Sequence, residues 1–197
     1  MTSHSREWNI RRVLAIEDGP FSKSDRYCLL LGVVTTNNSI QRFVLDRIDV
    51  DGTDATRKVT SLARRTGSLD LILLPSISLG GFNVVNAHKL HQETNLPILV
   101  VNPVRPDLGS VKKALRRHFA DWKEKIALFH RMGPPHTLRI SRRETAYFYC
   151  VGLPPLKAAG MLRKMVQFGK RPEPLRIARI VARALGDSPS VEALRSI

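Results

Sequence analysis

Short apolar runs separated by polar turns recur along this chain, and they predict the strands of a sheet. The first buried strand is predicted over 13–16, followed by strands at 27–36 and 40–50. The tight connection at Asn37 and Asn38 indicates that these two form an antiparallel hairpin. Further apolar runs along the chain predict the remaining strands at 69–74, 96–101 and 146–151.

Amphipathic segments with apolar residues every three to four positions lie between and after these strands. These segments predict six helices, over residues 55–65, 84–94, 108–118, 122–131, 155–168 and 174–185. This order indicates an α/β fold with a central mixed sheet and helices on both faces. The length of 197 residues suits one domain, expected over 13–185, with a flexible basic N-terminus at 1–12 and a C-terminal tail at 186–197.

A buried strand that runs into a double glycine marks the segment 71–86. Gly80 and Gly81 have no Cβ, so the backbone there is free to bend sharply and to approach a substrate closely. A helix is expected straight after Asn83, and ligands of open α/β sheets bind at the carboxyl ends of the strands. The alternative is that the glycines only make a tight turn and that Asn83 is the N-cap of the helix.

Charge is the most informative bulk property. Lysine and arginine number 32 against 17 acidic residues, a net charge of +15, which favours a polyanionic partner. Nucleic acid is the first candidate, anionic membrane the second, and solubility alone the third. No apolar run approaches the roughly 18 residues of a membrane span, and no secretory signal is recognised, so we expect a cytoplasmic protein with Cys28 and Cys150 as free thiols.

Basic residues recur at helical spacing in two of the predicted helices. Lys112 and Arg116 are four residues apart, and Arg176 and Arg179 lie on one ridge of the last helix. Like charges at these spacings repel by a few tenths of a kcal/mol per pair, which a bound phosphate would relieve. A solvated helix face is the alternative for each stripe.

Acidic residues follow the first and the third predicted strands. Asp18 ends the first strand, while Asp51 and Asp54 follow the third. If these carboxylates gather at the sheet end, they would hold Mg²⁺ or Mn²⁺ for phosphodiester hydrolysis inside a cationic shell. The alternative is that Asp54 is a helix N-cap and that Asp51 is a turn residue bonded to its own backbone.

Four motifs occur together in a fixed order: IEDGPF at 16–21, VDGTDAT at 50–56, GGFNVV at 80–85 and GKRPEPLR at 169–176. With these motifs the chain resembles the family called domain of unknown function 99, which is related to endonuclease V. The resemblance implies a ribonuclease-H-like fold and a Mg²⁺-dependent endonuclease that nicks DNA at a deaminated base such as deoxyuridine. It also implies that Asp18 is a metal ligand and that Asp51 or Asp54 is the second acidic ligand.

The same resemblance places Phe82 and Asn83 near a flipped base and Arg105 near the catalytic lysine of endonuclease V. The chain departs from the family pattern at the end of the fourth strand, where many relatives carry aspartate and this sequence has Pro75. Asn86 likewise stands where relatives often carry aspartate. Three functions therefore remain open: an endonuclease weakened by a lost ligand, an inactive nucleic-acid-binding protein of the same fold, and a basic scaffold.

Overall fold

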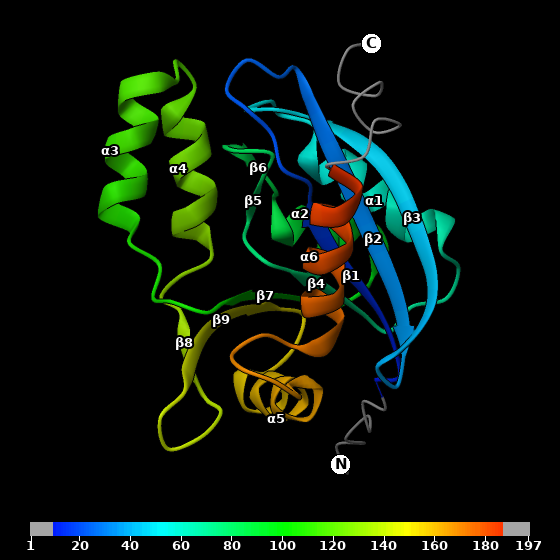
Figure 1. Cartoon of the computed structure of the whole chain (residues 1–197). Helices are drawn as coiled ribbons and strands as arrows, with labels where there is room; N and C mark the ends of the chain where they lie inside the picture. The colour runs from blue at the N-terminus through cyan, green and yellow to red at the C-terminus, as the bar shows by residue number, and fades with distance from the viewer. Residues whose placement is uncertain (1–9, 187–197) are drawn as a thin grey trace.

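A seven-stranded mixed sheet organises the computed structural model, which describes residues 10–186 (Figure 1). Its strand order is β3-β2-β1-β4-β7-β9-β8, so β1 lies in the interior of the sheet. β1, β2 and β3 form an antiparallel meander, and β4 and β7 run parallel to β1. β9 is antiparallel to β7, and β8 is antiparallel to β9. The strands are β1 (Arg12–Asp18), β2 (Tyr27–Thr36), β3 (Ser39–Asp49), β4 (Leu71–Leu74), β7 (Ile98–Asn102), β8 (His136–Arg139) and β9 (Thr145–Val151).

Helices cover both faces of the sheet, as the sequence predicts. The core on one face includes Leu14 and Ile16 of β1 and lies beneath α1 (Ala55–Arg65) and α2 (Ala87–Thr94). The core on the other face includes Val13 and Ala15 and lies beneath α5 (Pro155–Met165) and α6 (Glu173–Gly186). Because side chains of a strand alternate between faces, Asp18 shares the α1 and α2 face and Glu17 the α5 and α6 face.

Two further helices, α3 (Leu108–His118) and α4 (Trp122–Arg131), form a hairpin at the side of the sheet (Figure 1). They pack mainly against each other. Only the last turn of α4 and the residue after it reach the core under α1 and α2, through Leu128, Phe129 and Met132. The hairpin is therefore an arm that contributes only the end of α4 to this core.

The predicted antiparallel hairpin and the predicted bounds of α1, α3 and α4 are confirmed. Asn37 and Asn38 both adopt positive φ, of 50° and 66°, as a tight two-residue turn between twisted strands requires. No helix within 10–186 is long and apolar enough to cross a membrane. The expected flexible termini fall mostly outside the described residues.

One predicted helix starts later than expected. The helix predicted from residue 84 begins at Ala87, because β5 (Ser78–Leu79) and β6 (Asn83–Val84) pair as a small separate hairpin. Asn86, whose side chain accepts a hydrogen bond from the Lys89 amide at 3.0 Å, is the N-cap of α2. The interpretation of Asn83 as that cap was wrong, and Asn83 has another role.

Candidate active site

The turn between β5 and β6 lies against the carboxyl end of β1. Its two glycines adopt positive φ, 52° at Gly80 and 83° at Gly81, a conformation that residues with a Cβ rarely adopt. A Cβ on Gly81 would collide with the carboxylate of Asp51. The double glycine therefore allows the predicted sharp bend, and it lets the turn approach Asp51 of the β3–α1 connection.

Asp18 makes the first contact of this turn with the sheet. Its Oδ2 accepts a hydrogen bond from the Gly80 amide at 2.7 Å. Burial raises the pKa of Asp18, and the hydrogen bond from Gly80 offsets part of that rise. The strand end thus presents a desolvated carboxylate held in one orientation, which a bound cation would stabilise.

Asp51 contacts the same turn from the other side. Its Oδ1 accepts a hydrogen bond from the Phe82 amide at 2.7 Å, and its own amide donates to the carbonyl of Gly80 at 2.7 Å. Asp51 also has a positive φ of 58°. These contacts identify Asp51 as a turn residue that fixes the glycine turn, although its side chain binds Phe82 rather than its own backbone.

Asn83 is completely buried and binds three groups around the start of α1. Its Oδ1 accepts from the Ala55 amide at 2.8 Å, and its Nδ2 donates to Asp49 O at 2.9 Å and to Asp54 Oδ1 at 2.6 Å. Asp54 makes no side-chain hydrogen bond that caps α1, so Asn83 satisfies the first amide of that helix instead. Asn83 is too enclosed to touch a base, which corrects its predicted role in substrate binding.

The expected convergence of Asp18, Asp51 and Asp54 does not occur. Within residues 10–186, no three acidic, histidine or cysteine side chains form a group that could hold a metal ion. Asp51 is bound to Phe82 and Asp54 to Asn83, so each carboxylate already has a partner in the fold. Asp18 has a partner of the same kind in Gly80, and because burial raises its pKa, a cation beside it would stabilise its charged form.

The neighbouring strand end supplies no replacement carboxylate. Pro75 follows the last residue of β4, and its carbonyl accepts from Asn102 Nδ2 at 3.2 Å. Asn86, the second departure from the family pattern, caps α2. Both positions are therefore filled by neutral groups with structural contacts.

Two arginines of the predicted cationic ridge of α6, Arg176 and Arg179, have acidic neighbours while their side chains remain 38% exposed. Arg176 makes two hydrogen bonds to Glu173, at 2.6 and 2.7 Å, and Arg179 Nη1 lies 3.8 Å from Glu17 Oε1. Burial, then the nearby Asp18, raises the pKa of Glu17 to about 7, against the lowering effect of arginines that include Arg171. Each guanidinium therefore has an acidic neighbour and still reaches solvent, so the phosphate-binding role of Arg176 and Arg179 stays a prediction.

A cavity of about 210 Å³ opens beside the glycine turn at the ends of β4 and β7. Phe82 lines it from the turn, and Val111 and Phe129 line it from the arm. Its polar lining residues are Ser76, Ser78, Asn102 and Asp107, and Ile77, Pro106 and Tyr149 complete the wall. Pockets for drug-sized ligands begin at about 300 Å³, so this one suits a single planar ring system.

Comparison with known families decides what kind of protein carries this site. The family model described as endonuclease dU matches residues 9–186. The chain belongs to the endonuclease dU family. A protein of Thermococcus gammatolerans named UPF0215 protein is 40% identical over 181 residues, covering 88% of this chain and 91% of the relative.

Solved structures show the fold of this endonuclease dU family member. A protein of unknown function from Archaeoglobus fulgidus superposes with a TM-score of 0.80 at 32% identity, covering 90% of this chain and 99% of the other. The catalytic domain of human endonuclease V has a TM-score of 0.62 at 13% identity, covering 94% of this chain and 89% of the other. Ciona intestinalis endonuclease V, solved with inosine-containing DNA, has a TM-score of 0.60 at 10% identity, covering 90% of this chain and 86% of the other. The predicted ribonuclease-H-like fold of endonuclease V type is confirmed.

Other predicted residues of this endonuclease dU family member lie further from Asp18. Arg105 is exposed on the loop between β7 and α3, and no contact with the three aspartates is found for it in residues 10–186. Lys112 and Arg116 are exposed on α3, in the arm. Their place in substrate binding stays a prediction.

Lys125 is a site residue that the sequence reasoning missed. It is 4% exposed, and its Nζ donates to the carbonyls of Gly52 and Phe82, both at 2.9 Å. Lys125 occupies a position of α4 that continues the spacing of Trp122, Ile126 and Phe129, the inward face of the helix. A lysine at such a position was the signal that could have revealed it.

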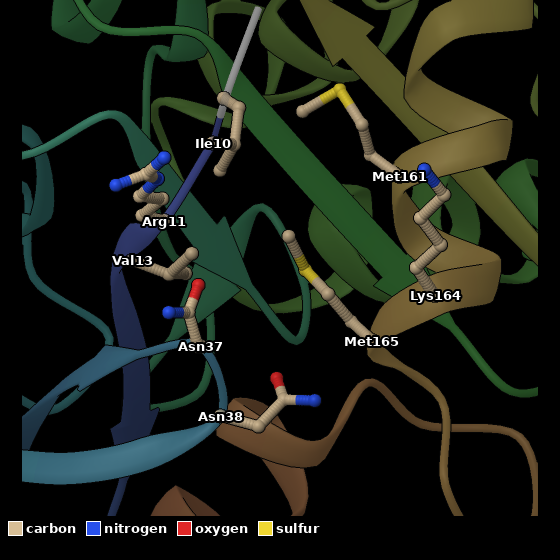
Figure 2. A pocket seen from close by; sticks show the side chains of 8 residues that line it. All are labelled: Ile10, Arg11, Val13, Asn37, Asn38, Met161, Lys164 and Met165. Carbon is tan, nitrogen blue, oxygen red and sulfur yellow. The ribbon is translucent and has the colours of Figure 1, made fainter.

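A larger cavity, of about 350 Å³, lies at the opposite end of β1 (Figure 2). Side chains of α5 face the start of β1 and the β2–β3 turn there, and none of the described residues in its wall carries a carboxylate. It is therefore unrelated to the strand-end acids. Its lining includes Ile10, Val13, Asn38, Met161, Lys164 and Met165.

Proposed function

We propose that this protein binds DNA at a deaminated base such as deoxyuridine and cuts the strand beside it. One observation carries the proposal: the part-buried carboxylate of Asp18 is hydrogen-bonded to Gly80, in the turn whose Phe82 lines the 210 Å³ cavity. A carboxylate that would hold a catalytic cation and a pocket that would accept a planar ring are thereby joined through three consecutive residues of one turn.

The family and the charge support this choice of substrate. The chain matches the endonuclease dU model along nearly all of its described length, and the structurally similar Ciona protein was solved with DNA that contains inosine, a deaminated base. A net charge of +15 raises the local concentration of a polyanion such as DNA. Together these features favour a nucleic-acid substrate over a small phosphate ester.

The cavity would receive the base after its extrusion from the duplex. Enzymes that act on one nucleotide of a duplex take it out of the stack and hold it between aromatic or apolar side chains. Phe82 and Tyr149 offer such surfaces, and the hydroxyls of Ser76 and Ser78 offer hydrogen bonds to the edge of a pyrimidine. Asn83 has no part in this contact because it is fully buried.

Asp18 would hold Mg²⁺ or Mn²⁺ in this proposal, and the ion would activate water and neutralise the leaving oxygen. The fit rests on Asp18, a desolvated carboxylate with a raised pKa. Gly80 fixes its orientation through the amide hydrogen bond, and Asp51 keeps the turn in place through Phe82. Oxygen atoms of the DNA phosphate and of water are the remaining ligands that such a cation accepts.

A second function, binding of damaged DNA without cleavage, is favoured by a separate observation. Residues 10–186 offer no group of three metal-binding side chains, and Pro75 replaces the acidic residue expected at the end of β4. A cation held by one carboxylate binds weakly, because affinity rises with the number of charged ligands. Recognition of the base in the cavity does not require the ion.

One experiment separates the two functions. The protein is incubated with matched duplexes that contain a single uracil or thymine, with Mg²⁺, with Mn²⁺ or with a chelator. A nick at uracil that needs the ion and is lost in Asp18→Asn, but kept in Glu124→Gln, which neutralises an exposed carboxylate of α4, supports the endonuclease. Tighter binding of the uracil duplex without a nick supports the second function, and equal binding without a nick refutes both.

A further inference from the structure

The α3–α4 arm carries a concentration of positive charge that the fold does not neutralise. Lys112, Lys113, Arg116 and Arg117 line an open groove of about 560 Å³ on α3. No ion pair involving any of the four is found among residues 10–186. Asp107, the nearest acid at the helix start, uses its carboxylate to cap α3 through Gly109 and Ser110. The groove therefore retains its full charge.

An aromatic side chain lies beside this groove on the second helix of the arm. The guanidinium of Arg116 lies 5.5 Å from the centre of the Trp122 ring, and the ammonium of Lys123 lies 5.9 Å from it. Arginine and lysine that flank an aromatic ring suit a nucleic-acid strand, whose phosphates pair with the cations while its sugars and bases contact the ring.

The arm lacks the features of a membrane-binding helix. Such a helix exposes an apolar face that enters the lipid. On α3 the apolar face is used inside the protein, since Leu115 is fully buried and Val111 lines the 210 Å³ cavity. A nucleic-acid backbone therefore fits the groove better than an anionic membrane does.

Lys125 fastens the arm to both loops of the candidate site. From α4 its ammonium reaches Gly52 O of the β3–α1 connection and Phe82 O of the glycine turn, with Asp51 O at 3.5 Å. The ring of Phe119, at the end of α3, packs edge-on against Phe82 with centroids 5.4 Å apart. One buried cation and one aromatic pair thus connect the arm to the turn that binds Asp18.

We propose that the α3–α4 hairpin is a phosphate-binding arm for a DNA strand, and that Lys125 is the positioning residue that holds this arm in register with the glycine turn. The inference rests on the proposed function for the identity of the strand. The groove of α3 grips backbone phosphates without regard to sequence, and the cavity that α3 shares with Phe82 lies between this grip and the strand ends.

The arm is tested by binding alone, with a fluorescent thymine-only duplex in a chelator. Lys112→Gln with Arg116→Gln is compared with Arg142→Gln and Arg143→Gln, which remove the same charge from the exposed β8–β9 turn. Each lost phosphate contact lowers the slope of log affinity against log salt by about 0.9, so we expect the arm variant to lose about two units of slope and the control less than half of that. Equal losses of salt slope in the arm variant and the control would contradict the phosphate-binding role of the arm. Binding of phosphatidylserine vesicles that depends on the arm cations would contradict it as well.

The role of Lys125 is tested with Lys125→Met, which keeps the length and packing of the side chain, and with Lys125→Arg, which restores the donors. Lys125→Met should keep the salt slope of the wild type, lose its preference for uracil over thymine duplexes, and exchange the amide hydrogens of Gly80 and Phe82 at least tenfold faster. Lys125→Arg should recover both properties in part. An unchanged exchange rate in Lys125→Met, or a lost salt slope, would overturn the positioning role.

These outcomes are independent of cleavage. If no duplex is ever nicked but the arm variant loses its salt slope, the arm stands and the endonuclease proposal fails. If uracil DNA is nicked and the arm variant binds DNA like the wild type, the endonuclease proposal is supported and the phosphate-binding role of the arm is refuted.

Discussion

Arg179 Nη1 lies 3.8 Å from Glu17 Oε1, on the face of β1 that points away from Asp18. Glu17 is 6% exposed, and its Oε2 has no hydrogen-bond partner among the described residues. Burial outweighs the attraction of Arg171, Arg179 and Arg183 and raises the pKa of Glu17 from 4.5 to about 7. The folded protein therefore keeps a proton on Glu17 over a pH range in which the unfolded chain has released it.

Replacing Glu17 with glutamine should remove a pH dependence of stability. Between pH 4.5 and 7 the folded state binds more protons at this residue than the unfolded state does, so the free energy of unfolding of the wild type falls as pH rises through this window. The shift corresponds to about 3 kcal/mol. Urea unfolding at pH 4.5 and pH 8 should show a smaller fall for Glu17→Gln than for the wild type. Equal falls would show that the carboxyl titrates normally.

Replacing Asn83 with alanine should destabilise the fold strongly. The substitution leaves the Ala55 amide, Asp49 O and Asp54 Oδ1 without their buried partner, at about 1–3 kcal/mol for each unsatisfied group. We expect a loss of about 3 kcal/mol or more in the free energy of unfolding, measured with urea. Gln41→Ala, on the exposed edge strand β3, should change it by less than about 0.5 kcal/mol. A loss at Asn83 as small as that control would contradict the network.

Two glycines with similar backbone angles allow a matched comparison of the active-site turn. Gly133→Ala places a Cβ in open space at φ 69°, and should lose only the roughly 1–2 kcal/mol of the left-handed conformation. Gly81→Ala has the same backbone cost and in addition drives its Cβ into the carboxylate of Asp51. Its free energy of unfolding should therefore fall further, and the preference for uracil DNA should decrease. Equal effects would mean that the turn shifts freely away from Asp51.

Restoring an acid at the end of β4 should improve cation binding. Pro75→Asp adds a carboxylate on the strand next to Asp18 and keeps the carbonyl that accepts from Asn102. A second charged ligand should tighten Mn²⁺ binding by about tenfold or more, measured by calorimetry, and raise any nicking in parallel. Pro75→Asn, a neutral side chain of the same shape, is the control. If aspartate and asparagine bind Mn²⁺ alike, the two strand ends do not share a cation site.

The sequence predicted those parts of the fold that repeat a local pattern. The helices over Leu108–His118 and Trp122–Arg131 have a clear period, and the strand over Tyr27–Thr36 is a continuous apolar run between polar residues, so their bounds were correct. The pairing of Ser78–Leu79 with Asn83–Val84 was missed, because strands of two residues show no period and are fixed by what packs around them.

The candidate site was harder to predict because its contacts join distant parts of the chain. Asp18 was correctly placed at a strand end, but only the fold reveals that Asp51 and Asp54 are bound by Phe82 and Asn83 instead of facing it. Arg176 is an exception, since its partner Glu173 lies three residues earlier, a spacing visible in the sequence. Its ion pair could have been anticipated, whereas the partner of Arg179 could not.

Glu17 and Asp18 point to opposite faces of the sheet, so the register of β1 decides which face receives which carboxylate. Losing one residue from this strand, or moving its register by one against β2 and β4, would exchange their surroundings. The glutamate would then face α1 and α2, and the aspartate would face α5 and α6. Insertions and deletions in β1 should accordingly be tolerated only in pairs, even where the apolar character of the strand is preserved.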